Sequence, residues 1–397
     1  MYERHVLRGA ASYLGAKGTA DRSASRPADA RCVLLTGATG FLGGAFLAHA
    51  RELLDPPVRW VLPVRGADDA DARRRVYKRL TRFVDERTAT RILSHVRVVR
   101  TDLCQPEALS DECLEGVTHV VHLAANTSFI ARTGVWEMNY EATKRLALRL
   151  RAVPTLQRFV YVGTAMICGN RASATVHEDS YPSSRAEHLV AYTESKAAAE
   201  QMLHDEFSDL PLVVARPSVV IGHSRLGCAP SGSIFWVVRA LERVRLLAGA
   251  ADASLDVVPA DYVAQALEHL TFADTLRHRT YHISAGDESR APIRELARRL
   301  AEASGETRGG ADYTVIRGED VGLYRKRMRE AFGPANGRRV QLALGLYLRF
   351  CELSLRFDNS RLRAEGVPAS PPLLDYLEAC LTQCRELSIV EQADDEI

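Results

Sequence analysis

Residues 32–43 read CVLLTGATGFLG, a short apolar run that leads directly into three glycines. The apolar run predicts a buried strand, and the residues after Gly40 open an amphipathic helix pattern. In such a strand–turn–helix unit, Gly37 permits the tight turn, Gly40 lets the backbone approach a pyrophosphate, and Gly43 lets the helix lie close to the strand. The N–H groups at the helix start then face phosphates. The turn predicts a dinucleotide site formed by Gly37, Thr39, Gly40, Phe41, Leu42 and Gly43, with a purely structural turn as the alternative.

The rest of the chain continues the alternation of short apolar runs and longer amphipathic stretches. This rhythm is typical of a parallel sheet with helices on both faces. The expected strands are Cys32–Thr36, Arg59–Val64, Val96–Arg100, His119–Leu123, Arg158–Val162, Leu212–Ala215 and Thr280–Ile283. The expected helices include Phe41–Leu54, Ala72–Glu86, Trp136–Val153, Ala191–Glu206, Ile234–Leu247, Ile293–Ala303 and Leu373–Cys384. The fold class is therefore α/β: a Rossmann-type, doubly wound parallel sheet with a smaller, mainly helical C-terminal substrate lobe.

The 397 residues divide into three expected parts. Residues 1–30 are rich in Ala, Ser and Arg without an apolar signal core, which predicts a flexible leader and leaves a transit peptide as the alternative. Residues 31–285 form the expected NAD(P)-binding domain, to which 217–255 belong while also contributing to the substrate lobe. Residues 286–397 form the C-terminal substrate lobe.

Composition and charge exclude several classes of protein. A net charge of +2 argues against a nucleic-acid-binding surface. No apolar run is long enough to predict a membrane span, and a cytoplasmic location is expected. The eight cysteines are scattered, and Cys380 and Cys384 have no histidine or further cysteine pair near them in sequence, so no metal site is expected. Buried thiols in a reducing compartment are the interpretation we favour. A homodimer remains open.

The tip of the second expected strand indicates which dinucleotide binds. An acidic residue there would hold a ribose 2′-hydroxyl, whereas a basic one accommodates a 2′-phosphate. This strand ends in Arg65-Gly66 with no acid at its tip. Because a guanidinium can bind phosphate through two N–H groups, we expect NADPH rather than NADH, with a merely exposed Arg65 as the alternative. Asp102 and Leu103, after the third strand, suit the adenine edge.

Tyr192 and Lys196 lie four residues apart on one expected helix face. A phenol normally titrates near pH 10. The lysine ammonium, together with the positive charge of an oxidised nicotinamide, is expected to lower the pKa of Tyr192 so that it can exchange protons. Thr164 follows the expected strand Arg158–Val162, and would meet the pair at the carboxyl edge of the sheet. There Thr164 would hydrogen-bond a substrate carbonyl while Tyr192 delivers the proton.

Four further polar residues are weaker candidates. Asn139, on the helix after the fourth strand, could support a water or a helix kink behind the catalytic pair, or be satisfied within its own helix. His122 at a strand end is interpreted as a packed core histidine. His177 and Glu178 lie in an expected loop from which they could touch substrate.

Together these residues resemble the extended short-chain dehydrogenase/reductases. Matching segments span residues 31 to about 285 in the family's order, and include Asp102-Leu103, the segment from His122 to Ala125, and Arg216-Pro217-Ser218. Within that superfamily, the opening at residues 33–43, Val64-Arg65 and the stretch LDVVPADYV at 255–263 are similar to fatty acyl-coenzyme A reductases and thioester reductase domains. The resemblance implies Thr164, Tyr192, Lys196 and Asn139 as catalytic residues and adds Ala124, Pro217, Tyr192 and Lys196 to the cofactor site. Gly163, where these reductases often carry serine, and Met166, where an aromatic is common, depart from the pattern.

The expected function is NADPH-dependent hydride transfer to a carbonyl, with an acyl thioester as the favoured substrate and aldehyde or alcohol as product. The thioester would be carried by coenzyme A or by an acyl carrier protein, with another small-molecule carbonyl as the alternative. One rival is a ketone/alcohol oxidoreductase or a nucleotide-sugar epimerase or dehydratase of the same superfamily, against which Arg65 argues. Another is a non-catalytic NADP-binding regulator, against which the presence of both Tyr192 and Lys196 argues.

Overall fold

The computed structural model divides the chain into residues 1–30 and a compact unit of residues 31–397. It describes residues 31–50, 58–105, 108–130, 133–170, 175–181, 186–232, 234–248, 253–303 and 313–394. The leader expected over residues 1–30 lies outside these ranges.

A seven-stranded sheet forms the centre of the compact unit, and all its neighbouring strands are parallel. Its strands are β1 (Cys32–Thr36), β2 (Arg59–Val64), β3 (Val96–Arg100), β4 (His119–His122), β5 (Arg158–Val162), β7 (Leu212–Pro217) and β12 (Thr280–Ile283). Their order is β3-β2-β1-β4-β5-β7-β12. The order reverses direction between β1 and β4, and ligands bind outside the carboxyl ends of the strands at such a switch point. The expected doubly wound fold is confirmed.

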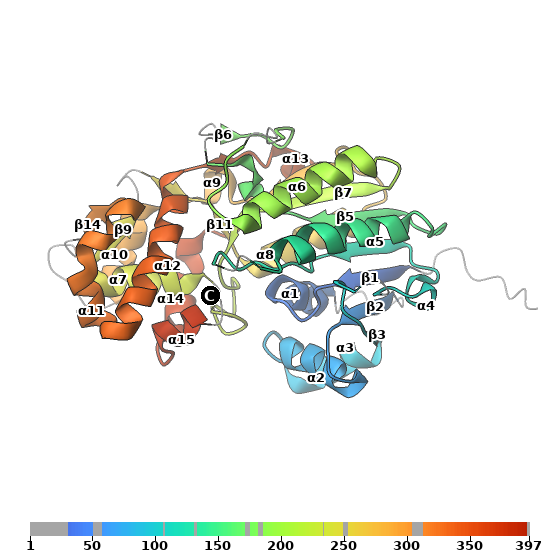
Figure 1. The fold of residues 1–397 in the computed structure, drawn as a ribbon, viewed down its shortest axis with the longest axis horizontal. Coiled ribbons are helices and arrows are strands. Elements are labelled where there is room, and N and C mark those ends of the chain that lie inside the picture. The colour runs from blue at the N-terminus through green and yellow to red at the C-terminus, as the bar shows by residue number, and fades with distance from the viewer. Residues whose placement is uncertain are drawn as a thin grey trace, which may run out of the picture. The chain divides into compact units, whose positions relative to one another are not determined.

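Both faces of the sheet are covered because its strands are apolar on both sides (Figure 1). In β1, Val33 and Leu35 pack into one core, while Cys32 and Leu34 pack into the other. The first core is covered by α1 (Phe41–His49), α2 (Asp69–Leu80), α3 (Glu86–Ser94) and α8 (Ala260–Phe272). The second is covered by α4 (Asp111–Leu114), α5 (Ala142–Leu150) and α6 (Ala191–Glu206).

Further helices gather beyond the carboxyl edge of the sheet and form two smaller cores (Figure 1). They are α7 (Phe235–Val244), α10 (Ile293–Ala303), α11 (Arg325–Phe332), α12 (Pro334–Glu352), α14 (Leu373–Cys384) and α15 (Ile389–Asp394). Four two-stranded pairings accompany the sheet and the lobe. These are β6 (Thr175–Val176) with β15 (Arg356–Phe357), β8 (Val219–Val220) with β11 (Val257–Val258), β9 (Leu246–Ala248) with β14 (Thr314–Ile316), and β10 (Ser254–Leu255) with β13 (Ala291–Pro292).

The chain then returns from the lobe to the sheet. Helix α13 (Ser360–Ala364) buries Leu362 in the same core as α1 and α8, as does Val367. The short helix α9 (Gly286–Ser289) follows β12. Residues numbered within the expected C-terminal lobe therefore complete the core of the nucleotide-binding part.

Four expected helices have different ends in the structure. The expected helix Trp136–Val153 is a π-helical turn (Glu137–Glu141) followed by α5, which ends at Leu150. Helix α1 ends at His49, and the remainder of the expected stretch to Leu54 falls largely in residues 51–57, outside the described ranges. The expected helix 72–86 is α2 followed by α3, because the Asp85 side chain caps a new helix by accepting a hydrogen bond from the Thr88 N–H at 2.8 Å. Helix α7 stops at Val244 because Arg245 adopts φ 54°, and the chain continues as β9.

Candidate active site

The glycine turn between β1 and α1 has the close packing that the sequence implied. Gly37 adopts φ +73°, and a Cβ there would lie 2.7 Å from backbone atoms of Leu123 and Ala124. A Cβ on Gly43 would clash with the carbonyl oxygen of Gly37. Gly40 is exposed, so the first turn of α1 is open to a ligand. This geometry fits a pyrophosphate bound by backbone N–H groups at the helix start.

A groove of about 1300 Å³ runs past this turn. Thr39, Gly40 and Phe41 line it together with Arg65 and Asp102. Four further basic side chains reach it from α2 and the residues just after it: Arg75, Lys78, Arg79 and Arg82. Arg65 is exposed at the tip of β2, where the sequence placed it, and no acid accompanies it there. Leu103 is buried in the core beside α5, so Asp102 alone of that pair faces the groove.

The groove continues into a cleft of about 300 Å³ that brings the expected catalytic residues together. Thr164, Tyr192 and Lys196 all line it, and so do Gly37 and Pro217. Helix α6 begins at Ala191, which places Tyr192 in its first turn and Lys196 one turn further, on the same face. Leu42 and Gly43 border the same cleft, whereas Ala124 does not; its N–H donates to Thr36 Oγ1 at 3.2 Å. Leu123 and Ala125 line the cleft on either side of Ala124.

Burial shifts the pKa values of both residues, and for Tyr192 it acts against the lowering expected from Lys196 and an oxidised nicotinamide. Burial raises the pKa of Tyr192 to about 12, and a hydrogen bond with Thr164 only partly offsets the rise. Burial lowers the pKa of Lys196 to about 7, against the opposing charge of Glu200. The ammonium of Lys196 donates to the Val162 carbonyl at 2.8 Å and lies 4.9 Å from the centre of the Tyr161 ring. Lys196 is thus bonded to the sheet through β5.

A buried ion pair lies directly behind the lysine. Glu200, one turn after Lys196 on α6, pairs with Arg216 of β7, and the two side chains are 1% and 0% exposed. Arg216 Nε donates to Glu200 Oε1 at 3.0 Å. A Cβ on Gly163 would lie 3.3 Å from Glu200 Oε2, tighter than usual contact. The glycine that departs from the reductase pattern therefore lies where the glutamate carboxylate leaves little room for a side chain.

Asn139, a candidate catalytic residue in the sequence analysis, does not line the cleft. It is fully buried in a π-helical turn (Glu137–Glu141) that precedes α5. Its Oδ1 accepts the Asn126 N–H at 2.8 Å, and its Nδ2 donates to Asn126 O and to Ser195 Oγ, both at 3.0 Å. The amide thereby links the loop after β4 to α6, the helix that carries Tyr192 and Lys196.

The weaker histidine and glutamate candidates lie away from the cleft. His122 is completely buried between the hydroxyls of Thr36 and Thr143, at 2.7 and 2.9 Å, and burial lowers its pKa to about 3. His177 contacts Asp358 at 3.1 Å. Glu178 accepts the backbone N–H groups of His282 and Arg361. His177 and Glu178 thus fasten the returning C-terminal segment to the sheet edge.

The described cysteines are all free thiols. Cys228 contacts Cys380 and Cys384 of α14, a proximity that the sequence spacing did not predict. Over the described ranges, no group of three or more His, Cys, Asp or Glu side chains is arranged to hold a metal ion. In the same part of the chain, no helix combines the length and apolar content needed to cross a membrane.

Two aromatic residues at the site were missed by the sequence analysis. Phe129, from the loop after β4, stacks on Tyr192 with ring centres 5.9 Å apart and on Tyr347 of α12 at 4.9 Å. Both Phe129 and Tyr347 line the cleft. They are separated by more than two hundred residues, and neither stands in a motif, so only the fold brings them to Tyr192.

Residues 35–267 match the model of an NAD-binding family described as "Male sterility protein". The chain belongs to this family. The match covers the glycine turn, Tyr192, Lys196 and the segment around Asp256, and it confirms the resemblance to extended short-chain dehydrogenase/reductases of the thioester reductase type. As a member, the protein is an NAD(P)-dependent oxidoreductase, and its dinucleotide is a nicotinamide cofactor.

The chain is also similar to individual relatives. It is 26% identical over 275 residues to a putative fatty acyl-CoA reductase, CG8303, of Drosophila melanogaster, covering 58% of this chain and half of that protein. The terminal R domain from the myxalamid PKS-NRPS biosynthetic pathway has the same fold, with a TM-score of 0.72 and 21% identity over 90% of this chain and 91% of that one. A thiolation-reductase di-domain from an archaeal non-ribosomal peptide synthetase matches with a TM-score of 0.70 and 14% identity, over 91% of this chain and 76% of that one.

Proposed function

We propose that the protein reduces acyl thioesters with NADPH and releases an aldehyde, which a second round can convert to an alcohol. The observation that carries the proposal is the cleft itself. Tyr192, Thr164 and Lys196 face one space that joins the glycine-turn groove on one side and an apolar pocket on the other. Reduction of a thioester with an apolar chain needs a proton donor, a dinucleotide beside that donor, and an apolar surface for the chain.

NADPH is supported over NADH by the charges around the adenosine end of the groove. Arg65 lies at the tip of β2, and with the four basic side chains at α2 it outnumbers the two acids that line the same groove, Asp102 and Glu137. A 2′-phosphate gains charge-assisted hydrogen bonds from such a cluster, whereas a 2′-hydroxyl gains little.

The bound cofactor would supply a hydride to the carbonyl carbon. Tyr192 would donate its proton to the carbonyl oxygen, with Thr164 donating a hydrogen bond to the same oxygen. The product of these two additions is a hemithioacetal. Breaking its C–S bond, with the hydroxyl proton passing to sulfur, gives aldehyde and free thiol. Lys196 would bind the nicotinamide ribose, as in the family that the chain resembles, once its ammonium turns from the Val162 carbonyl.

The source of the thioester is proposed from the relatives. One relative is named as a fatty acyl-CoA reductase, and one solved structure joins a thiolation domain to a reductase domain. Coenzyme A and a carrier domain present the same chemistry, an acyl group on the thiol of a pantetheine arm. We therefore propose an acyl-pantetheine thioester as the substrate, on either carrier.

Loss of absorbance at 340 nm tests the proposal directly. Purified protein is incubated with NADPH or NADH and with acyl-coenzyme A, acyl-pantetheine, a ketone panel or a nucleotide-sugar panel. We expect oxidation of NADPH with the thioesters, and aldehyde or alcohol by mass spectrometry. Tyr192→Phe should lower kcat by roughly 10²–10⁴-fold, while Tyr324→Phe, a tyrosine outside the cleft, should match the wild type. Turnover of ketones or nucleotide sugars, with none of thioesters, would refute the proposed substrate.

A further inference from the structure

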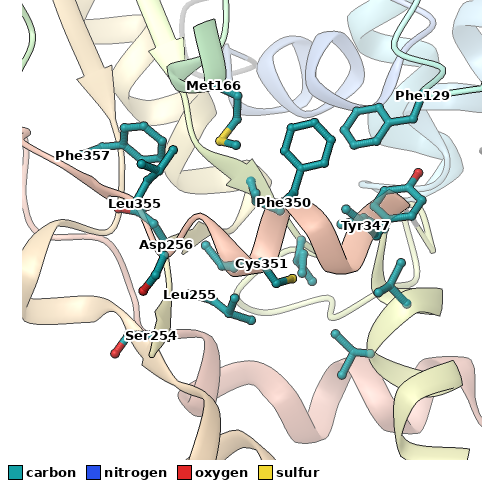
Figure 2. A pocket seen from close by; sticks show the side chains of 17 residues that line it. Phe129, Met166, Ser254, Leu255, Asp256, Tyr347, Phe350, Cys351, Leu355 and Phe357 are labelled. Carbon is teal, nitrogen blue, oxygen red and sulfur yellow. The ribbon is translucent and has the colours of Figure 1, made fainter. Parts of the chain in front are cut away.

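A second, apolar pocket of about 120 Å³ adjoins the catalytic cleft (Figure 2). Its walls come from α7, the short strands at residues 254–258, α12 and the residues that follow α12. Most of the lining side chains are aliphatic or aromatic, among them Val238, Leu255 and Leu355. The one carboxyl in the lining, Asp256, accepts the Ala285 N–H at 2.9 Å, and burial raises its pKa to about 6. Such a surface favours an apolar occupant over a charged one.

The pocket and the cleft are continuous. Five residues line both spaces: Phe129, Met166, Val219, Ile234 and Tyr347. Phe129 lies at the junction, since its ring stacks on Tyr192 on one side and lies 5.0 Å from the ring of Phe350 on the other. Figure 2 shows Phe129, Tyr347 and Phe350 gathered on one side of the pocket. A chain attached to a carbonyl beside Tyr192 would pass this aromatic junction and enter the pocket.

We propose that this pocket binds the distal part of an unbranched acyl chain and limits its length to about six to eight carbons in all. The proposal rests on the function proposed above. A dry apolar cavity of about 150 Å³ in another protein holds one benzene, so this pocket accommodates roughly four or five carbons. The carbonyl carbon and one or two carbons at the aromatic junction complete the chain. The pocket thus defines a medium-chain acyl thioester as the substrate class.

Chain length should then control catalysis in two stages. Transfer of each methylene from water into the apolar pocket strengthens binding about fourfold. The specificity constant kcat/KM for acyl-pantetheines should therefore rise steeply from acetyl to about hexanoyl or octanoyl. Beyond that length further carbons find no space without repacking, so the constant should level off or fall.

Cys351 offers a substitution that shortens the pocket. It lies on α12, lines the pocket, and does not line the catalytic cleft. Cys351→Phe should lower kcat/KM for octanoyl-pantetheine at least tenfold, because the larger side chain would exclude about two or more methylenes from the pocket. The same substitution should change kcat/KM for acetyl-pantetheine less than twofold. Leu342→Phe is the matched control, because Leu342 lies on the same helix and its side chain is 66% exposed. The control should retain the wild-type length profile.

Calorimetry separates this proposal from the proposed function. S-octyl-pantetheine, a thioether that cannot be reduced, should bind the NADP⁺-loaded protein at least tenfold more tightly than S-ethyl-pantetheine, and Cys351→Phe should remove that preference. Tight octyl binding without reduction of any thioester would sustain the pocket and overturn the proposed reaction. Reduction with no dependence on chain length, or a length profile unchanged in Cys351→Phe, would overturn the pocket and leave the reaction standing.

Discussion

Replacing Glu200 by glutamine should strongly destabilise the protein, although the two side chains have nearly the same size and shape. The side chains of Glu200 and Arg216 are almost completely buried, and Arg216 Nε donates to both glutamate oxygens at 3.0 and 3.2 Å. Arg216 Nη2 also donates to Glu200 Oε1, at 2.5 Å, and Nη1 donates to the carbonyls of Glu178 and Ser180. An amide at position 200 keeps the shape but leaves the guanidinium charge buried without a counter-charge, which costs about 3–5 kcal/mol of unfolding free energy.

Urea denaturation of the cofactor-free protein measures this cost. Asp209→Asn is the control, because Asp209 forms a comparable pair with Arg151 at the surface, and exposed pairs contribute little. The double variant Glu200→Gln/Arg216→Met removes both charges, so it should be more stable than the sum of the two single losses implies. If Glu200→Gln unfolds at the same urea concentration as Asp209→Asn, the buried pair does not have the role described.

Three further predictions concern cofactor choice, the glycine turn and pH. Arg65→Ala should lower kcat/KM for NADPH by about 10–100-fold with little change for NADH, as loss of a charged hydrogen bond implies; equal losses in steady-state assays with the two cofactors would contradict this role. Gly43→Ala should abolish dinucleotide binding in a fluorescence titration, because the added Cβ would clash with the Gly37 carbonyl, whereas Gly322→Ala, with no neighbour nearer than 4.0 Å, should bind normally. The pKa of Glu178 is raised from 4.5 to about 7 by burial, so the folded protein holds this proton more tightly and stability should fall as pH rises between those values. Urea unfolding at pH 5 and pH 8 should show a smaller fall for Glu178→Gln than for the wild type, and parallel falls would refute the assignment.

The sheet and the nucleotide site were predictable because their signals are local in sequence. Five of the seven sheet strands have the expected bounds, among them β1 and β5. Each is a short apolar run bounded by polar or turn residues, and burial on both faces forces this composition. Helix ends were less predictable. Helix α7, for example, ends where Arg245 adopts a left-handed conformation, which is uncommon for a residue with a side chain and cannot be inferred from the sequence.

The substrate side of the site could not be read from the sequence. Phe129 and Tyr347 meet only because α12 crosses the carboxyl edge of the sheet, and no spacing rule connects residues so far apart in the chain. The same holds for Cys228 against α14. Asn139 was identified from the sequence, but its bonds to the loop after β4 and to Ser195 required coordinates.

The raised pKa of Tyr192 bears on the direction of the reaction. In an oxidation the phenol must give up its proton before it can accept one from an alcohol, and a neighbouring cation would assist that loss. In a reduction the phenol must hold its proton until negative charge develops on the carbonyl oxygen. A pKa of about 12 keeps Tyr192 protonated throughout the neutral range, and the hydrogen bond with Thr164 holds it at the cleft. Lys196 donates its own hydrogen bond to the Val162 carbonyl. Burial of the phenol therefore suits the role of proton donor that we propose for Tyr192 in thioester reduction.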